Sequence, residues 1–166
     1  MKKTDLTKDD LTKTDLKKPD LKKTDKKADL KKKALKQQVS DAIHACQEKK
    51  AEQIAVLELE QGSGAFTDYF VVCSGTNPRQ IQAISDEVEL RLKRAGQYPN
   101  SIEGYKQAEW VLIDYVDFVV HIFSESARKF YDLERLWKSA KKLEPAELVA
   151  APRKKAVAKK AVRKRA

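Results

Sequence analysis

The chain has 166 residues, a length typical of one domain with room for tails. Its formal net charge of +10 usually indicates a negatively charged partner such as nucleic acid. No stretch approaches the roughly 20 apolar residues of a membrane span, and the N-terminus lacks the apolar core of a signal peptide. We therefore expect a cytoplasmic protein and not a membrane or secreted one.

The positive charge is concentrated at the two ends of the chain. Residues 1–36 contain 14 Lys and 7 Asp, a net charge of +7, and residues 145–166 contain 8 Lys and Arg and one Glu, again +7. Subtracting both ends from the total leaves 13 basic and 17 acidic residues between them, a net charge of −4. All 12 aromatic residues lie in this middle segment, so the part that can fold is not the basic part.

The N-terminal arm repeats the dipeptide Asp-Leu every five residues from Asp5 to Leu21. Five residues advance a helix by about 140°, so the leucines form no apolar stripe, and an odd period also fails the alternation of a strand. A pentapeptide-repeat β-helix is the alternative, but these pentads make about one coil of a solenoid that needs at least three stacked units. We therefore expect residues 1–33 to be a disordered, lysine-rich arm.

The first half of the middle segment predicts two helices and two strands. Apolar residues recur at helical spacing over residues 34–49, which indicates a helix. The apolar runs 54–59 and 69–73 are typical of buried strands. Asn77 is the expected N-cap of a second helix, which Gly96 is expected to end. The buried face of that second helix is predicted to consist of Ile81, Ile84, Val88 and Leu92.

The second half indicates a hairpin and a last helical region. Trp110–Asp114 and 118–123 are predicted to pair as antiparallel strands because only three residues separate them. A weaker strand is expected over 101–104. Either Ser124 or Ser126 is expected to cap the last helical region.

These elements predict one α/β domain over residues 34–144, with a small mixed β-sheet flanked by helices. Residues 145–166 are expected to form a disordered, basic Lys/Ala-rich tail. Such a tail adheres to the phosphates of RNA by releasing counterions, without reading sequence. The alternative is a tail that only improves solubility.

The strongest candidate for catalysis consists of Asp68, Asp114 and Asp117 beside the turn at Gly75 and Thr76. This set would resemble the metal and phosphate site of a nucleotidyltransferase. Asp117 lies in the predicted hairpin turn and Asp68 precedes a different strand, so we do not expect the carboxylates to converge. No Walker-type or dinucleotide glycine motif is present in the sequence.

The histidines and cysteines also indicate no catalytic or metal site. His44 and His121 are the only histidines, and His121 alternates with apolar residues of a predicted strand, which favours a structural role. Cys46 and Cys73 are predicted to be buried apolar side chains. We therefore predict no enzyme, no cofactor and no metal.

Aromatic side chains gather near charged residues in the second half of the chain. They are Trp110, Tyr115, Phe123, Phe130, Tyr131 and Trp137. Aromatic residues of this kind commonly anchor protein interfaces. Core packing is preferred for Phe118, Leu133 and Trp137, whereas both core packing and surface anchoring stay open for Trp110 and Tyr131.

Several linked motifs carry a resemblance to a known family. In chain order they are AFTDYFVVCSGTN (65–77) with Arg79, Glu103 and Gly104, WVLIDY (110–115), DFVVHIF (117–123) and FYDLERLW (130–137). They span about residues 36–138, nearly the whole predicted domain. This combination resembles the ribosome silencing factor family, called RsfS or Iojap-like.

The resemblance implies an α/β domain distantly similar to nucleotidyltransferases but without catalysis, and often homodimeric. It implies binding to the large ribosomal subunit through ribosomal protein fourteen. Occupying that protein would block association with the small subunit and repress translation under nutrient limitation, and the factor would also assist late subunit maturation. The partner-facing residues implied by the family are Trp110, Asp114, Phe123, Arg128 and Tyr131.

Two features depart from the family. Where the family often has Gly in the hairpin turn, this chain has Val116, so the turn cannot rely on an easy positive φ there, and its geometry stays open. Both basic tails lie outside the family pattern, and we expect them to contact ribosomal RNA. The alternative functions are a tail-driven RNA-binding or ribosome-assembly protein and a nucleotidyltransferase-like enzyme.

Overall fold

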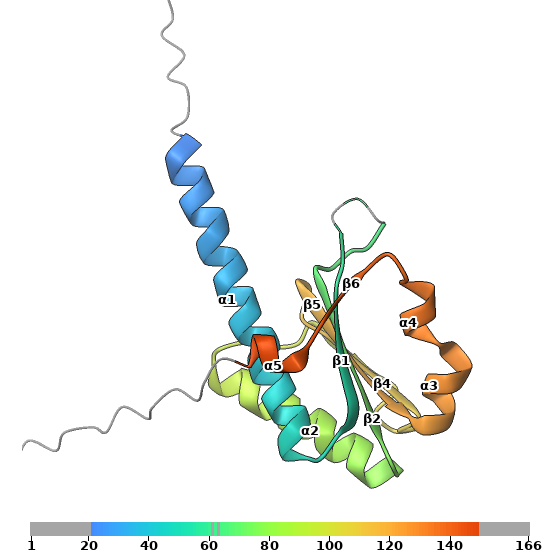
Figure 1. Cartoon of the computed structure of the whole chain (residues 1–166). Coiled ribbons are helices and arrows are strands. Elements are labelled where there is room, and N and C mark those ends of the chain that lie inside the picture. Colours follow the sequence, from blue (N-terminus) through green and yellow to red (C-terminus); the bar gives the residue numbers. More distant parts are fainter. Residues whose placement is uncertain (1–20, 61, 63, 150–166) are drawn as a thin grey trace, which may run out of the picture.

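The computed structural model describes residues 21–60, 62 and 64–149 (Figure 1). The strands are β1 (Glu52–Glu58), β2 (Tyr69–Gly75), β3 (Ser101–Glu103), β4 (Trp110–Asp114), β5 (Phe118–Ser124) and β6 (Lys141–Leu143). They form one sheet in the order β3-β4-β5-β2-β1-β6. β2 and β5 pair in parallel, and the other neighbours within the described residues pair antiparallel.

Helices lie on both faces of this sheet. They are α1 (Leu21–Glu48), α2 (Pro78–Arg94), α3 (Glu125–Tyr131), α4 (Leu133–Leu136) and α5 (Pro145–Leu148). Figure 1 shows α1, α2 and α5 on one face and α3 and α4 on the other. The predicted fold class, a small mixed sheet flanked by helices, is confirmed.

The main core fills the space between the sheet and the helices α1 and α2. Its large, fully buried side chains include Ile43, Tyr69, Ile81, Ile84, Leu92, Ile113, Phe118 and Ile122. Burying one such side chain contributes roughly 1.5–3 kcal/mol. Every residue of β2 is buried, as expected for a central strand covered on both faces. Cys46 and Cys73 lie in this core, as predicted.

The start and end of α2 follow the sequence prediction. The Asn77 side chain accepts a hydrogen bond from the Gln80 backbone N–H at 2.9 Å, which confirms Asn77 as the N-cap. After the last turn, Gly96 adopts a φ of +80°, and the Gln97 N–H donates to the Leu92 carbonyl. This is the hydrogen bond of a Schellman motif, for which glycine is the favoured residue.

The first helix begins at Leu21, well before the predicted start at residue 34. The prediction of disorder is therefore wrong for residues 21–33, while residues 1–20 lie outside the described part of the chain. Residues 21–48 contain no proline or glycine, and the packed second half provides a nucleus from which the helix can propagate. Lys31 and Lys32 also form ion pairs with Asp117 and Glu58.

The predicted C-terminal tail also begins too early. β6 pairs antiparallel with β1, and Leu143, Leu148 and Val149 pack against the main core. The expectation of a disordered tail is thus wrong for residues 145–149, and residues 150–166 lie outside the described residues. A strand of three residues is too short to give a periodic signal.

The hairpin turn places Val116 at a positive φ of +69°. The Asp117 N–H donates to the Tyr115 carbonyl at 2.8 Å, and the Val116 N–H donates to Asp114 Oδ1 at 2.7 Å. The Tyr115 and Phe118 rings stack with centroids 4.8 Å apart. These contacts hold a β-branched residue in a backbone region that it rarely adopts.

The last helical region is capped by Ser124, whose Oγ accepts from the Ala127 N–H at 3.2 Å. The region is divided into α3 and α4 at Asp132, which has a left-handed φ of +43°.

Candidate protein-docking face

The face of the sheet that bears α3 and α4 is rich in aromatic side chains. We call it the aromatic face and define it by Phe70, Trp110, His121, Phe123 and Tyr131. Alternation along β4 and β5 directs their odd and even residues to opposite faces. For this reason Val111 and Ile122 enter the main core, whereas Trp110 and Phe123 belong to a second cluster on the aromatic face.

Trp110 lies at the centre of this face. It is directly opposite Phe123 in the antiparallel register, and the two rings stack with centroids 5.0 Å apart. The Tyr131 ring lies 4.6 Å from the Trp110 ring. Trp110 is half-buried and Tyr131 is 51% exposed, so the two predicted anchors form one continuous surface patch.

His121 supports this patch from beneath. Its Nδ1 accepts a hydrogen bond from the Trp110 indole N–H at 3.2 Å, and Phe70 packs edge-on against its ring at 4.8 Å. Burial lowers the pKa of His121 to about 4, so the imidazole is neutral near pH 7. Its buried Nε2 has no hydrogen-bond partner among the described residues. This environment fits the predicted structural role.

Two of the residues predicted to face a partner, Phe123 and Arg128, do not lie on the surface. Phe123 is fully buried beneath Trp110, so its predicted direct contact with a partner is wrong. Its role is to support the Trp110 ring. The resemblance placed Phe123 on the correct face, but its depth depends on the covering Trp110 and Tyr131.

Arg128 is also an internal residue. Its guanidinium donates to the Gln53 carbonyl at 2.7 Å, to Ser74 Oγ at 2.9 Å and to both carboxylate oxygens of Glu134. Only 11% of the Arg128 side chain is exposed. Arg128 therefore fixes α3 to β1, β2 and α4, and the prediction that it faces a partner is corrected.

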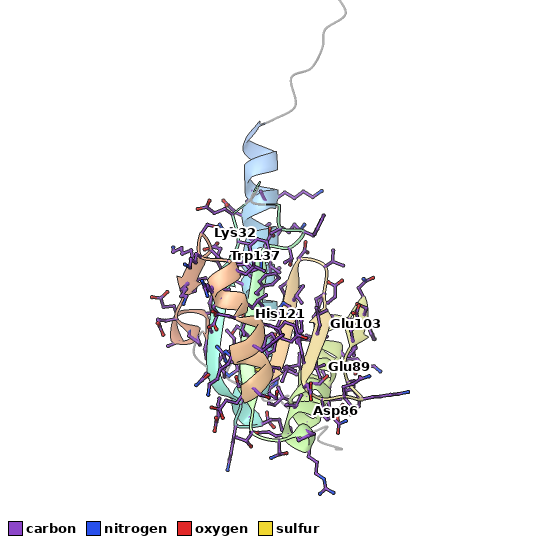
Figure 2. The ribbon with its side chains drawn as sticks, turned by 90° about the vertical axis from the view of Figure 1, so that its right-hand side faces the viewer. Lys32, Asp86, Glu89, Glu103, His121 and Trp137 are labelled. Atoms are coloured by element: carbon purple, nitrogen blue, oxygen red, sulfur yellow. The ribbon has the colours of Figure 1, made fainter. Side chains whose placement is uncertain are left out.

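A cleft of about 460 Å³ adjoins the patch on the same face. Its apolar lining includes Phe70, Leu112, Val119 and Trp137, and Asp114 lies among its polar residues. Figure 2 views the molecule from this side and labels His121 and Trp137. The cleft offers an apolar surface with one carboxylate at its edge, an arrangement suited to a protein partner that combines apolar and basic side chains.

Asp114 keeps both carboxylate oxygens engaged at this edge. Oδ1 accepts from the Val116 N–H, and Oδ2 accepts from the Asn100 side-chain amide at 3.1 Å. Each oxygen retains further acceptor capacity. Asp114 is half-buried, so it remains available to an approaching cation.

Residues beyond the predicted set also build this face. Large apolar side chains that are exposed on or beside it include Phe66, Phe130 and Leu136. Leu112 shares the alternation of Trp110 and Asp114, so its position was available from the sequence. Trp137, which we expected in the core, is half-buried and lines the cleft, whereas Phe118 is fully buried as predicted.

The residues of the candidate catalytic set lie at two ends of the sheet. The Asp68 N–H donates to the Asp117 carbonyl where β2 and β5 begin, whereas Gly75 and Thr76 follow the other end of β2. Seven strand residues separate the two ends by roughly 20 Å. Within the described residues, no group of three or more His, Cys, Asp or Glu is arranged to hold a metal ion.

None of the described helices has the length and apolar character of a membrane span.

Comparison with known proteins identifies the family of this chain. The profile of the family described as "Ribosomal silencing factor during starvation" matches residues 31–166. A ribosomal silencing factor of Halalkalibacterium halodurans is 41% identical over 103 residues, which cover 62% of this chain and 87% of that protein. That of Bacillus subtilis is 40% identical over 99 residues, covering 60% and 83%.

A more distant relative and two solved structures are also similar to this chain. A mouse protein named for mitochondrial assembly of the ribosomal large subunit is 30% identical, over 55% of this chain and 41% of its own. A solved structure from Bacillus halodurans superimposes with a TM-score of 0.56 at 39% identity, covering 64% of this chain and 95% of that one. One from Chromobacterium violaceum gives 0.56 at 34% identity, covering 58% and 80%.

The profile matches well over half of the chain, and similar proteins of two bacteria carry the family name. The chain therefore belongs to the ribosomal silencing factor family, RsfS.

Proposed function

We propose that the protein is a non-enzymatic silencing factor that binds the large ribosomal subunit through ribosomal protein fourteen. In this proposal it blocks association with the small subunit in the cytoplasm and represses translation under nutrient limitation. The observation that carries the proposal is the contact between the half-buried Trp110 and the exposed Tyr131 on the aromatic face of a chain that belongs to this family.

The chemistry of this face supports a protein partner. Partly exposed aromatic residues that rest on a rigid sheet lose little conformational entropy when a partner covers them. The adjoining cleft is mostly apolar, and Asp114 adds a negative charge at its edge. The middle segment has a net charge of −4, which complements a basic ribosomal protein.

Two further contacts belong to this proposal. The basic tails would contact neighbouring ribosomal RNA by releasing counterions. The family profile includes the C-terminal tail, contrary to our expectation, whereas residues 1–30 lie outside it. In the absence of the ribosome, the exposed apolar residues of the aromatic face would be covered by a second copy of the chain, giving a homodimer.

The test is sedimentation of purified large and small subunits through a sucrose gradient with and without the protein. We expect the protein to sediment with the large subunit and the peak of joined ribosomes to decrease as protein is added. Binding to the small subunit alone, or an unchanged joined peak at saturation of the large subunit, would contradict the proposal. Removing residues 150–166 tests the tail-driven alternative, in which binding would be lost with the tail.

A further inference from the structure

The outer part of α1 is a helix without a packed apolar face. Every side chain over residues 26–34 is exposed, and Leu35 is the first buried one from residue 26 onward. Figure 1 shows α1 continuing well beyond the sheet and the other helices. At 1.5 Å per residue, the backbone from residue 21 to residue 34 extends roughly 20 Å.

This outer part carries a high positive charge. Residues 21–36 contain eight lysines and two aspartates, a net charge of +6, next to a middle segment of net charge −4. The lysines divide into two groups. Lys31 and Lys32 reach the domain, where they form ion pairs with Asp117 and Glu58.

The second group of lysines points away from the domain. It consists of Lys26, Lys27, Lys33 and Lys36, which we call the outer lysine face. All four are exposed, and none forms an ion pair with another residue of the described chain. Helical geometry places Lys26 and Lys33 opposite the buried Leu35, about 10 Å apart along the axis.

The helix would be stabilised by a polyanion on this face. Lys33 and Lys36 are three residues apart, and Lys32 and Lys36 are four apart, spacings at which like charges each destabilise a helix by roughly 0.2–0.5 kcal/mol. A membrane surface is a poorer partner because such helices bury a broad apolar face. Leu30 is the only large apolar side chain exposed over residues 26–34.

We propose that the outer lysine face is a preformed binding surface for the phosphate backbone of RNA. This inference adds specific residues to the proposed contact of the basic tails with RNA. It rests on the proposed function only for the identity of the polyanion, which is RNA. The helix holds the lysines at fixed spacing, and its inner part is anchored in the main core through Leu35 and Val39. Binding therefore requires less ordering than binding by an unstructured tail of equal charge.

The experiment measures binding of the full chain to a fluorescently labelled RNA hairpin by anisotropy across a salt series. Replacing Lys26, Lys27, Lys33 and Lys36 by Gln should weaken binding by about tenfold or more near 0.1 M salt and lower the salt slope by about 2–3. The matched control replaces Lys154, Lys155, Lys159 and Lys160 by Gln, which removes the same charge from the C-terminal segment. This control variant should lose less RNA affinity than the outer-lysine variant.

A second variant tests the helix separately from its charge. Ala28→Pro keeps every lysine but breaks the outer helix, because proline in a helix interior costs about 3 kcal/mol. It should weaken RNA binding, whereas Ala28→Ser should not. Circular dichroism and thermal unfolding check that the domain stays folded in each variant.

Three results would overturn the inference. They are equal losses of RNA binding in the two quadruple variants, or RNA binding by Ala28→Pro as tight as the parent's. The third comes from a parallel sedimentation assay with phosphatidylserine vesicles, in which the outer-lysine variant would lose vesicle binding but keep RNA binding. The assay contains no ribosome, so its outcome does not depend on the docking face. Trp110→Ala should bind the RNA hairpin as tightly as the parent protein does, even if it no longer binds the large ribosomal subunit.

Discussion

Trp110 and Tyr131 are the two residues on which docking should depend most. Aromatic anchors of interfaces commonly lose about 2–4 kcal/mol on truncation, so Trp110→Ala should weaken binding to the large subunit roughly 30- to 1000-fold. Tyr131→Ala should also weaken binding, and it disturbs the fold less because Tyr131 is 51% exposed. Binding is measured by co-sedimentation over a concentration series.

The matched control for these variants is Tyr98→Ala, which removes an exposed aromatic side chain located outside the aromatic face. Unchanged affinity in both Trp110→Ala and Tyr131→Ala, with circular dichroism and melting like the parent's, would show that the docking face lies elsewhere.

Val116 carries backbone strain that a single substitution can release. A non-glycine residue with a φ of +69° is held there at a cost of about 1–3 kcal/mol. Glycine has no such penalty but loses roughly 0.5–1 kcal/mol of extra chain entropy on folding. Val116→Gly should therefore stabilise the domain by about 1 kcal/mol in urea unfolding. Val116→Ala retains a Cβ atom and should give no comparable gain, and equal gains in both would contradict the strain argument.

His121 makes the stability of the domain depend on pH in the acid range. Its pKa falls from the ordinary 6.5 to about 4 in the folded state, so the unfolded chain binds the proton more tightly. Stability is therefore full above pH 6.5 and decreases as the pH falls toward 4, by up to about 3 kcal/mol from this group. His121→Gln keeps an acceptor for Trp110 and should flatten this dependence. Equal pH profiles of melting temperature in the two proteins would exclude His121 as the cause.

At the scale of elements, the sequence predicted the helices and strands that have a clear apolar period or a capping residue. It missed those that form only because they pair with or extend from another element. The strands that contain Tyr69 and Phe118 and the capped helix at Asn77 were located from apolar runs and a capping residue. β6 has only three residues and exists because the edge of β1 is free to pair. The outer helix of α1 has no apolar stripe, so periodicity gave no signal there.

The residues of the candidate site were also predicted only in part. The resemblance named Trp110, Asp114 and Tyr131 as partner-facing, and in the structure all three lie on the same face of the sheet. The burial of Phe123 and the internal hydrogen bonds of Arg128 depend on how α3 folds back over β1 and β2, which no local pattern records.

The β6–α5 segment gives a prediction at this scale. Ending the chain after Ala140 removes the apolar contacts of Leu143, Leu148 and Val149 with the core and exposes the edge of β1. We expect a loss of about 3 kcal/mol in the free energy of unfolding and a tendency to aggregate through the open edge. Ending the chain after Val149 is the control and should leave stability unchanged. Equal stability of both truncated proteins in urea unfolding would contradict this role of the segment.

At the scale of the whole molecule, charge and apolar surface are separated. Figure 1 shows the inner part of α1 on one face of the sheet and α3 and α4 on the other, while the outer part of α1, which carries the outer lysine face, continues beyond the sheet. Protein docking and RNA binding would therefore use different surfaces, and substitutions at the two should combine additively in ribosome binding.

The parallel pairing of β2 with β5 sets the order in which the chain can fold. Tyr69 pairs with Phe118, 49 residues further along, so β1 and β2 can form a local hairpin long before β2 acquires its second neighbour. Closing that distance carries an entropic barrier, and contacts of this kind slow folding. During synthesis, the hydrophobic edge of β2 stays open until β5 has emerged. A chain that stalls between these two strands would therefore expose an adhesive strand edge, which is the state in which chaperones would be needed.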